Sequence, residues 1–385
     1  NVWVEKARTV APLIEQYRDQ SEKQRHLAKP VYEAIRELGL FKLWLPRSLR
    51  GEELDLRTGC EVIEALAKLD GGAAWNLGIA LQSGWLLGFL EQDVAAEMLA
   101  DDPDATLGGS GHPHGVATPV EGGYRVSGQW PFLSGSNHTR WLCANCRFRT
   151  EDGEGFQMSE SGPPVMRFLF FRSDQYEVLD TWYSTGLRAS GSNDIKVVDA
   201  FVPEGRQIDL FVKKSEYQTG PLYGTGLQQV LGPPLAFVAL GVAAEAIDAF
   251  AELAIGKVPT FGSKRLIESD HIQMTLGKAM ARLGSARSYL YEKIDLLWEA
   301  MLAGNGSDEA VAMELGAAAA NAAESAVAAV ELVWGAAGTS GVYEGNALER
   351  CARDVRMVTQ HIGSAPSNYT KAGAYRLGLG VTMGR

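Results

Sequence analysis

Cysteine is scarce in this chain of 385 residues, which contains only Cys60, Cys143, Cys146 and Cys351. So few cysteines exclude the disulfide-rich scaffold of a small secreted protein. Cys143 and Cys146 form a CxxC pair, but no second pair of metal ligands accompanies it. The surrounding run is typical of a strand, in which residues three apart point to opposite faces. We therefore interpret both cysteines as structural, with a redox or metal role as the alternative.

Basic residues are also in the minority. The 36 Lys and Arg residues stand against 47 Asp and Glu, and the formal net charge of −11 argues against nucleic acid or an anionic membrane as a partner. The first twenty residues carry charges throughout and resemble no signal or transit peptide, so we expect a cytoplasmic protein. Three acidic residues interrupt the longest apolar run, 239–255, which indicates a core helix rather than a membrane span.

Common motifs for nucleotides and metals are missing as well. No G-x-G-x-x-G follows an N-terminal strand, no G-x-x-x-x-G-K-[ST] occurs, and no His, Cys and carboxylate set has metal-ligand spacing. The sequence therefore gives no support to the usual nucleotide or metal site, and we expect no metal.

The pattern of apolar residues changes clearly along the chain. Apolar residues recur at helical spacing over 1–104, short β-rich runs separated by glycine fill 105–212, and alanine-rich helical patterns occupy 213–385. The segments predict an α+β protein with an N-terminal helical domain, a central β-domain containing an exposed loop at 149–164, and a C-terminal four-helix bundle. The expected bundle helices are 235–256, 269–304, 308–335 and 346–361. Several of them are apolar on more than one face, which predicts burial against another subunit.

The order of these segments and several local motifs together resemble the acyl-CoA dehydrogenase fold. The motifs are ELGLFKLWLPRSLRGEELDL, EVIEALAKLDGGAAW, GYRVSGQWPFLSG, TGLRASGSNDIKVVDAFVPE, HIQMTLGKAMARLGSAR and GAAGTSGVYEGNALERCARD. The resemblance covers nearly the whole chain and implies a central domain that is barrel-like, between the N-terminal helices and the four-helix bundle. Arg353 and Asp354, in the last motif, are expected to pair structurally.

One departure from the dehydrogenases separates the branches of this superfamily. Where common dehydrogenases carry a catalytic glutamate, this sequence has Ile362, which cannot take a proton, and His361 stands beside it. RDVRMVTQHIGSAPSNY and WPFLSGSNH resemble the flavin-dependent monooxygenases of this fold. These are the oxygenase components of two-component aromatic hydroxylases, sulfur oxidisers and amino-sugar N-oxygenases.

The resemblance implies a specific function. A separate NAD(P)H-dependent reductase would supply reduced flavin (FADH2 or FMNH2), and with O2 a C4a-hydroperoxyflavin would hydroxylate a small aromatic or heteroaromatic compound, phenol-like or indole-like. Proteins of this family usually form homotetramers, so the resemblance also implies a homotetramer. The alternatives are an acyl-CoA dehydrogenase or oxidase with a relocated base, an amino-sugar N-oxygenase, and an inactive flavin-fold protein that serves as a binding module.

The resemblance also assigns candidate residues around the flavin. Ser134 would contact the flavin and tune its reactivity, next to Gly135, and Trp130 and Phe132 would share one face of a strand toward the ring or the pocket. In TGLRASGSND the serines and the backbone would hold the flavin phosphate or ribose, with Arg188 either a ligand or an ion-pair partner. The residues assigned to flavin binding are Trp130, Phe132, Ser134, Gly135, Arg188, Ser190 and Ser192. IGKVPTFGSKR has Lys257 but no arginine before Phe261, which leaves the choice between FAD and FMN open.

A second set of candidates would act on the substrate. His361 has a titration range suited to taking a proton from a phenol, an indole or an amine. The pocket candidates are His112, His114, Trp75, Gln82 and Trp85, while His138 would lie near the flavin-binding strand or only brace its turn.

Overall fold

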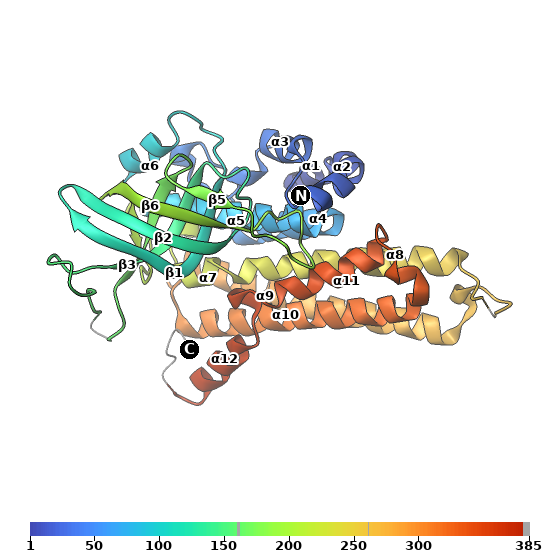
Figure 1. Ribbon diagram of the computed structural model, residues 1–385. Coiled ribbons are helices and arrows are strands. Elements are labelled where there is room, and N and C mark those ends of the chain that lie inside the picture. Colours follow the sequence, from blue (N-terminus) through green and yellow to red (C-terminus); the bar gives the residue numbers. More distant parts are fainter. Residues whose placement is uncertain (160–161, 261, 380–385) are drawn as a thin grey trace.

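The computed structural model describes residues 1–159, 162–260 and 262–379, and it begins with a helical segment (Figure 1). The helices are α1 (Val2–Arg8), α2 (Ala11–Gln24), α3 (Lys29–Glu37), α4 (Leu56–Leu69), α5 (Gly71–Leu86) and α6 (Gln92–Met98). Asp70 starts α5, because its carboxylate accepts a hydrogen bond of 2.8 Å from the backbone N–H of Ala73. Nearly every residue of α5 is buried, so this helix forms the centre of the molecule.

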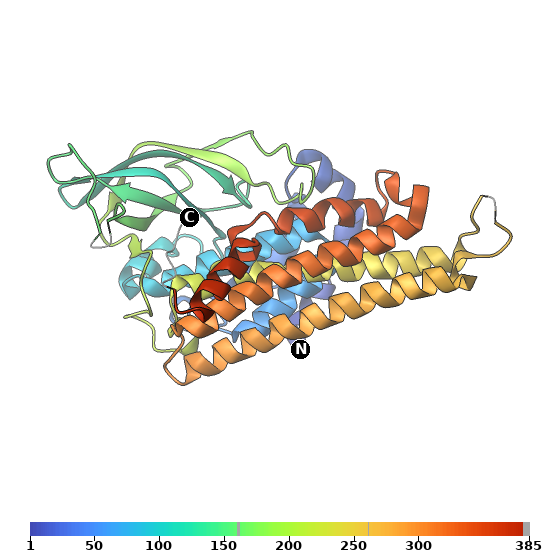
Figure 2. The same cartoon turned by 90° about the horizontal axis from the view of Figure 1, so that it is seen from below.

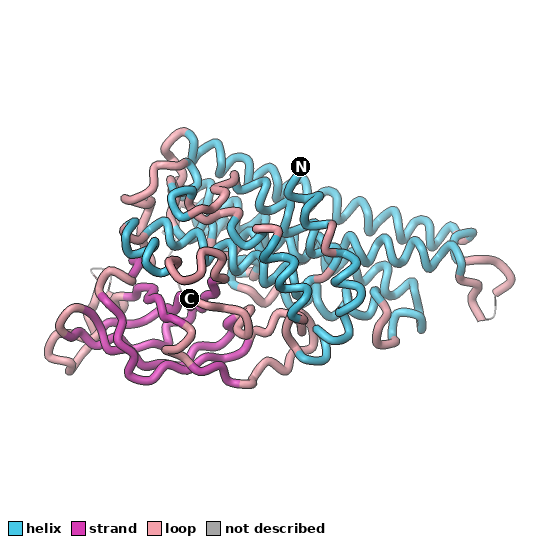
Figure 3. The backbone as a smooth tube through the Cα atoms, turned by 90° about the horizontal axis from the view of Figure 1, so that it is seen from above, coloured by secondary structure: helices cyan, strands magenta, loops and turns pink. Residues whose placement is uncertain are grey.

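A single seven-stranded sheet follows. Its strands are β1 (Leu107–Val120), β2 (Gly123–Leu133), β3 (Trp141–Phe148), β4 (Met166–Arg172), β5 (Glu177–Leu179), β6 (Asn193–Pro203) and β7 (Gln207–Asp209). The strand order is β5-β6-β2-β1-β3-β4-β7, and the β1–β3 pair is parallel while the other pairs are antiparallel. The sheet curls at one end of the molecule, beside the helices (Figure 3).

The two faces of the sheet bury different apolar clusters. Cys143 belongs to the large core shared with the helices, whereas Cys146 belongs to a smaller cluster within the β-domain that includes Trp130 and Phe171. Both thiols are free and buried. The prediction that the two cysteines point to opposite faces of a strand is therefore confirmed.

Two of the three register shifts in the strand ladders bring side chains close together. The β1–β3 register shifts between Ser110 and Gly115, and the β2–β6 register shifts between Trp130 and Leu133. The rings of His112 and Phe132, one from each irregular stretch, lie 5.6 Å apart. The bulges thus gather side chains that a regular ladder would have alternated between faces.

The C-terminal part is an elongated helical bundle (Figure 2). Its helices are α7 (Leu227–Val230), α8 (Ala236–Gly256), α9 (Asp270–Leu302), α10 (Glu309–Ala337), α11 (Ala347–Val358) and α12 (Ser367–Arg376). The four ranges predicted from the sequence correspond to α8, α9, α10 and α11. The predicted α+β fold is confirmed.

Helices α8 and α10 are both long and apolar, yet they differ in burial. The most apolar stretch of the helical segment that ends with α8 is 83% buried, so α8 is a core helix, as the sequence predicts. The corresponding stretch of the segment Glu309–Val342, which consists of α10 and the short 3-10 helix after it, is only 33% buried. Helix α10 therefore keeps an apolar face that this chain alone does not cover.

Candidate active site

Two turns meet where β2 ends and β6 begins, beside α5. The backbone N–H of Gly135, after β2, donates to the carbonyl oxygen of Ser190, before β6, at 2.7 Å. The Ser136 hydroxyl donates to the carbonyl of Gly191 at 2.8 Å. Gly135 has a φ of 73°, in the left-handed region that favours glycine. These bonds hold the two turns as one unit.

A row of hydroxyl groups lies buried between these turns and α5. The indole Nε1–H of Trp75 donates to Ser134 Oγ at 2.9 Å, and Ser134 Oγ lies 2.8 Å from Ser192 Oγ. The row continues to Ser190 Oγ, 2.7 Å from Ser192 Oγ. The structure thus brings together Trp75, Ser134, Ser190 and Ser192, which the sequence assigned separately to pocket and flavin. The hydroxyls of Ser190 and Ser192 face Ser134 inside the protein rather than a phosphate on its surface.

His361 joins this group from the segment after α11. Its ring meets the Trp75 indole edge to face, with the centroids 5.5 Å apart. The backbone N–H of Gly363 donates to His361 Nδ1 at 3.1 Å, so the neutral ring carries its proton on Nε2. Burial, together with the nearby His112, lowers the pKa of His361 to about 4. In this tautomer Nε2 donates, which suits a hydrogen bond to a substrate better than the proton acceptance expected from the sequence.

Several exposed aromatic and imidazole rings belong to the neighbouring strands β1 and β2. His112 and His114 lie on the β1 bulge with ring centroids 5.5 Å apart, and burial lowers the pKa of His112. Phe132 is 56% exposed and has a φ of 64°. Its ring meets that of Trp182 edge to face at 6.4 Å. An exposed phenyl group on a left-handed backbone points to a ligand that covers it.

Two tryptophans predicted at the site lie elsewhere. Trp130 is fully buried in the cluster within the β-domain, where its Nε1–H donates to the Asn145 carbonyl at 2.7 Å. The expectation that Trp130 and Phe132 share a face is wrong, because the bulge at 130–133 breaks the alternation. Trp85 is also fully buried: its Nε1–H donates to the Leu222 carbonyl at 3.0 Å. The structure brings neither indole to the group around Ser134.

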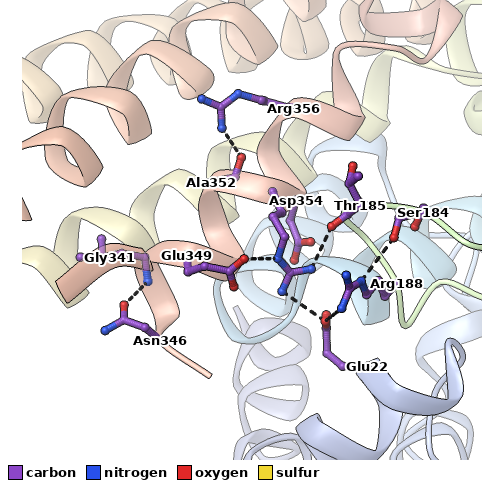
Figure 4. A network of polar contacts seen from close by, with 12 residues as sticks. Glu22, Ser184, Thr185, Arg188, Gly341, Asn346, Glu349, Ala352, Asp354 and Arg356 are labelled. Carbon is purple, nitrogen blue, oxygen red and sulfur yellow. Dashed lines mark hydrogen bonds and ion pairs between the residues drawn. The ribbon is translucent and has the colours of Figure 1, made fainter. Parts of the chain in front are cut away.

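Arg188 lies in an ionic cluster at the base of the second turn (Figure 4). Glu22 accepts from Arg353 at 3.2 Å and lies 3.9 Å from Arg188, and Glu349 accepts from Arg353 at 2.6 Å. Of the two roles predicted for Arg188, flavin ligand or ion-pair partner, the structure supports the ion-pair partner. The long distance to Glu22 and a side chain that is 38% exposed leave its guanidinium accessible.

Arg353 and Asp354 serve different partners instead of pairing with each other. Arg353 also donates to the Thr185 carbonyl at 3.0 Å, while Asp354 accepts from the backbone N–H of Leu187 at 2.7 Å. Burial raises the pKa of Asp354 to about 7 against the opposing effect of that hydrogen bond. Both residues tie α11 to the turn that carries Arg188.

His138 and Lys257 have structural partners. His138 stacks on Tyr32 with the centroids 4.1 Å apart, and its Nε2–H donates to the Leu27 carbonyl at 3.2 Å, so it braces the turn against the N-terminal helices. Lys257 donates to the Ala337 carbonyl and to Ser340 Oγ, each at 2.7 Å, at the end of α10. Phe261 lies outside the described residues.

Sequence reasoning missed Trp182 and Asn76. Trp182 lies four residues before the GLRASGSND turn, and this proximity was the available signal. The Asn76 amide donates to the Ala189 carbonyl at 3.4 Å, while its Oδ1 is buried without a hydrogen-bond partner. This oxygen lies 3.4 Å from where a Cβ on Gly135 would be. No signal in the sequence pointed to it. Gln82, the remaining pocket candidate, lies buried on α5, and its Nε2 likewise lacks a partner.

These residues fit a flavin. Phe132 and Trp182, whose rings are perpendicular to each other, offer aromatic surface to a planar apolar system. The Ser134 hydroxyl and the unpartnered Asn76 carbonyl offer a donor and an acceptor to a polar edge. No group of three or more His, Cys, Asp or Glu residues within the described part of the chain could hold a metal ion.

Comparisons with known proteins bear on the fold and on the class of enzyme. The family described as "Acyl-CoA dehydrogenase, C-terminal domain" matches residues 234–366. Indole-3-acetate monooxygenase of Pseudomonas putida is 28% identical over 93% of this chain and 89% of its own length. The oxygenase component of the FADH(2)-dependent resorcinol hydroxylase of Rhizobium sp. is 27% identical over 92% and 88%, respectively.

Solved structures show the same fold. The 3-HSA hydroxylase from Rhodococcus sp. RHA1 superposes with a TM-score of 0.90 at 22% identity, covering 98% of this chain and 97% of that one. XiaF from Streptomyces sp., solved with FADH2 and glycerol, gives 0.90 at 24% identity, over 98% and 95%. The resemblance inferred from the sequence is confirmed: the chain has the acyl-CoA dehydrogenase fold, and the curated relatives that it matches over most of its length include oxygenase components of flavin-dependent monooxygenases.

Proposed function

We propose that this protein is the oxygenase component of a two-component monooxygenase, which uses reduced flavin and O2 to hydroxylate a small aromatic or heteroaromatic compound. The observation that carries the proposal is the meeting of Trp75, Ser134 and His361 at the end of β2, in a chain whose relatives over nine-tenths of its length are aromatic-compound oxygenases. A separate reductase would supply the reduced flavin by diffusion.

The first task of the site is to bind the flavin. When bound, reduced flavin supplies the electrons that activate dioxygen. The Ser134 hydroxyl would contact the polar edge of the ring, and Phe132 and Trp182 would cover its apolar part. Gly135 lets backbone approach closely, because it has no side chain. The accessible guanidinium of Arg188 is suited to a phosphate, which both FMN and FAD contain.

The second task is to orient the substrate. Among the described residues, His361 Nε2 has no hydrogen-bond partner, so its N–H is free to donate to a phenol oxygen. Trp75 offers an aromatic edge beside it, and His112 lies near enough to affect the pKa of His361. Neutral imidazoles and an indole suit an uncharged aromatic ring that carries one polar group.

The assembly follows from the uncovered face of α10. We infer that this face packs against other copies of the chain in a homotetramer, since much of the apolar surface of this helical segment is only partly buried in the single chain. The balance of acidic over basic residues is compatible with a protein of the cytoplasm.

A single-turnover experiment tests the proposed function. The protein is mixed anaerobically with chemically reduced FMN or FAD and then with labelled dioxygen and a panel of phenols, indoles and amino sugars. One labelled oxygen atom in an aromatic product is expected, and free flavin without protein is the control. If no labelled product forms with FMN or with FAD, the proposal is overturned. In a separate anaerobic titration of the protein with oxidised FAD, loss of flavin colour on addition of an acyl-CoA would favour a dehydrogenase instead.

A further inference from the structure

The buried row of hydroxyl groups suggests a role beyond simple contact with a cofactor. We propose that Ser190, Ser192 and Ser134 form a reversible hydrogen-bond relay, oriented by the indole of Trp75, through which Ser134 donates to oxidised flavin and accepts from reduced flavin. The inference rests on the proposed function, in which Ser134 touches the flavin.

The polarity of the relay follows from the groups that compose it. An indole N–H can only donate, so Ser134 Oγ always accepts from Trp75. Each serine hydroxyl can donate one hydrogen and accept others. When Ser190 donates to Ser192 and Ser192 to Ser134, the hydrogen of Ser134 is left for the ligand. When the order is reversed, Ser134 donates to Ser192 and its oxygen can accept from the ligand.

Burial makes this polarity matter. Ser190 is fully buried, and Ser192 and Ser134 are only 4% and 5% exposed. Water therefore cannot easily satisfy a hydroxyl that loses its partner, and an unsatisfied buried hydroxyl costs about 1–3 kcal/mol. Both orders keep the two contacts between serines and the contact with Trp75, and they differ at Ser190, which donates to Ser192 in the first order and accepts from it in the second.

The surrounding backbone leaves only the hydroxyl hydrogens free to rearrange. Gly135 N–H bonds to the Ser190 carbonyl, and the Asn193 amide donates to Ser136 Oγ at 3.0 Å. On the other side, a Cβ on Gly72 would lie 3.1 Å from the Ser190 nitrogen, so α5 packs closely on this turn. The oxygens of the relay are thus fixed, and reversal requires rotation about C–O bonds alone.

An oxygenase component needs such a device more than most flavoproteins. It must take up reduced flavin from solution and hold the same ring through to its oxidised form. Reduction adds hydrogen to a ring nitrogen, which turns an acceptor into a donor. A single serine with fixed neighbours would match one of these states, whereas the relay matches both.

The test compares the affinities of the two flavin states. In Ser192→Ala, the Ser134 hydrogen has no acceptor inside the protein when the ligand donates, while donation to an oxidised ligand remains possible. We expect the ratio of dissociation constants, reduced over oxidised, to rise about tenfold. The midpoint potential of bound flavin should fall by about 30 mV for a tenfold change. Anaerobic titrations and spectroelectrochemistry measure both quantities without turnover.

Two further variants make the result decisive. Ser136→Ala is the matched control, because Ser136 is as buried as Ser192 and lies in the adjoining turn beside Ser134, but bonds to Gly191 and Asn193 outside the relay. It should leave the ratio unchanged. Ser190→Ala removes the far end of the relay and should shift the ratio in the same direction as Ser192→Ala, and it replaces that variant if the latter does not fold.

The outcomes separate the relay from the proposed function. An unchanged ratio in Ser192→Ala and Ser190→Ala, with wild-type protein that binds flavin and hydroxylates, overturns the relay alone. An equal shift in Ser136→Ala also overturns it, because the effect would then come from the turn. Wild-type protein that binds neither FMN nor FAD in either state overturns both proposals.

Discussion

His361 shows how one backbone contact changes the chemistry of a side chain. Because Gly363 donates to Nδ1, the ring offers an N–H rather than a lone pair from Nε2. We expect His361→Gln, which keeps an N–H donor, to reduce hydroxylation by about tenfold or less, and His361→Ala to reduce it further. Flavin binding should stay near the wild-type level in both. Turnover rates and flavin titrations check this.

The same substitutions distinguish a donor from a base. Loss of a general base costs about 10²–10⁴ in rate, and glutamine cannot replace it. Equal and severe losses in both variants would therefore restore the proton-acceptor role. Since the pKa of His361 is about 4, its protonation does not change between pH 5.5 and 8, and we expect no loss of rate from this ring across that range.

Asp354 provides a prediction about stability. Burial raises its pKa from 3.8 to about 7, so the folded protein holds this proton more tightly than the unfolded chain does. The sign follows from linkage: the contribution to stability is largest below pH 3.8 and is lost as the pH rises toward 7. Asn keeps an oxygen that can accept from Leu187. As the pH rises from 4 to 8, the unfolding free energy of Asp354→Asn should increase relative to that of the wild-type protein by roughly 2–4 kcal/mol.

Denaturant unfolding of both proteins over this pH range measures the difference. The comparison isolates Asp354 because the buried histidines titrate alike in the two proteins. His138, whose pKa burial lowers to about 4, lowers the stability of both as the pH falls from 6.5 to 4. A difference that stays constant with pH would contradict the raised pKa.

At the scale of elements, the sequence was informative wherever contacts are local. The bundle helices were predicted within a few residues, because apolar periodicity and caps are local properties. The strand order and the parallel β1–β3 pair depend on pairing between distant segments, which no local pattern encodes. For the candidate site, a motif predicted Ser134, which the structure places beside Trp75. The position of Trp130 was predicted wrongly because alternation cannot reveal a bulge.

The bulge at Phe132 can be tested by itself. Glycine adopts the left-handed backbone without strain but loses more entropy on folding, and each effect is worth about 1 kcal/mol. We therefore expect Phe132→Gly to leave the melting temperature within a few degrees of wild type. Loss of the exposed ring should weaken flavin binding about tenfold. A large drop in stability with intact flavin binding would identify Phe132 as a structural residue.

At the scale of the whole molecule, the partly buried apolar face of α10 is the surface through which we expect copies of the chain to assemble. Ala328 lies half-buried on this helix. A glutamate there can reach water in an isolated chain but would be desolvated in an interface between copies. We expect wild-type protein to elute as a tetramer in light-scattering chromatography and Ala328→Glu to shift toward smaller species. Val120→Glu is the matched control, because Val120 is 41% exposed and lies on the β1–β2 hairpin of the sheet instead of on α10. It should leave the mass unchanged, and a monomeric wild-type protein would refute the assembly through α10.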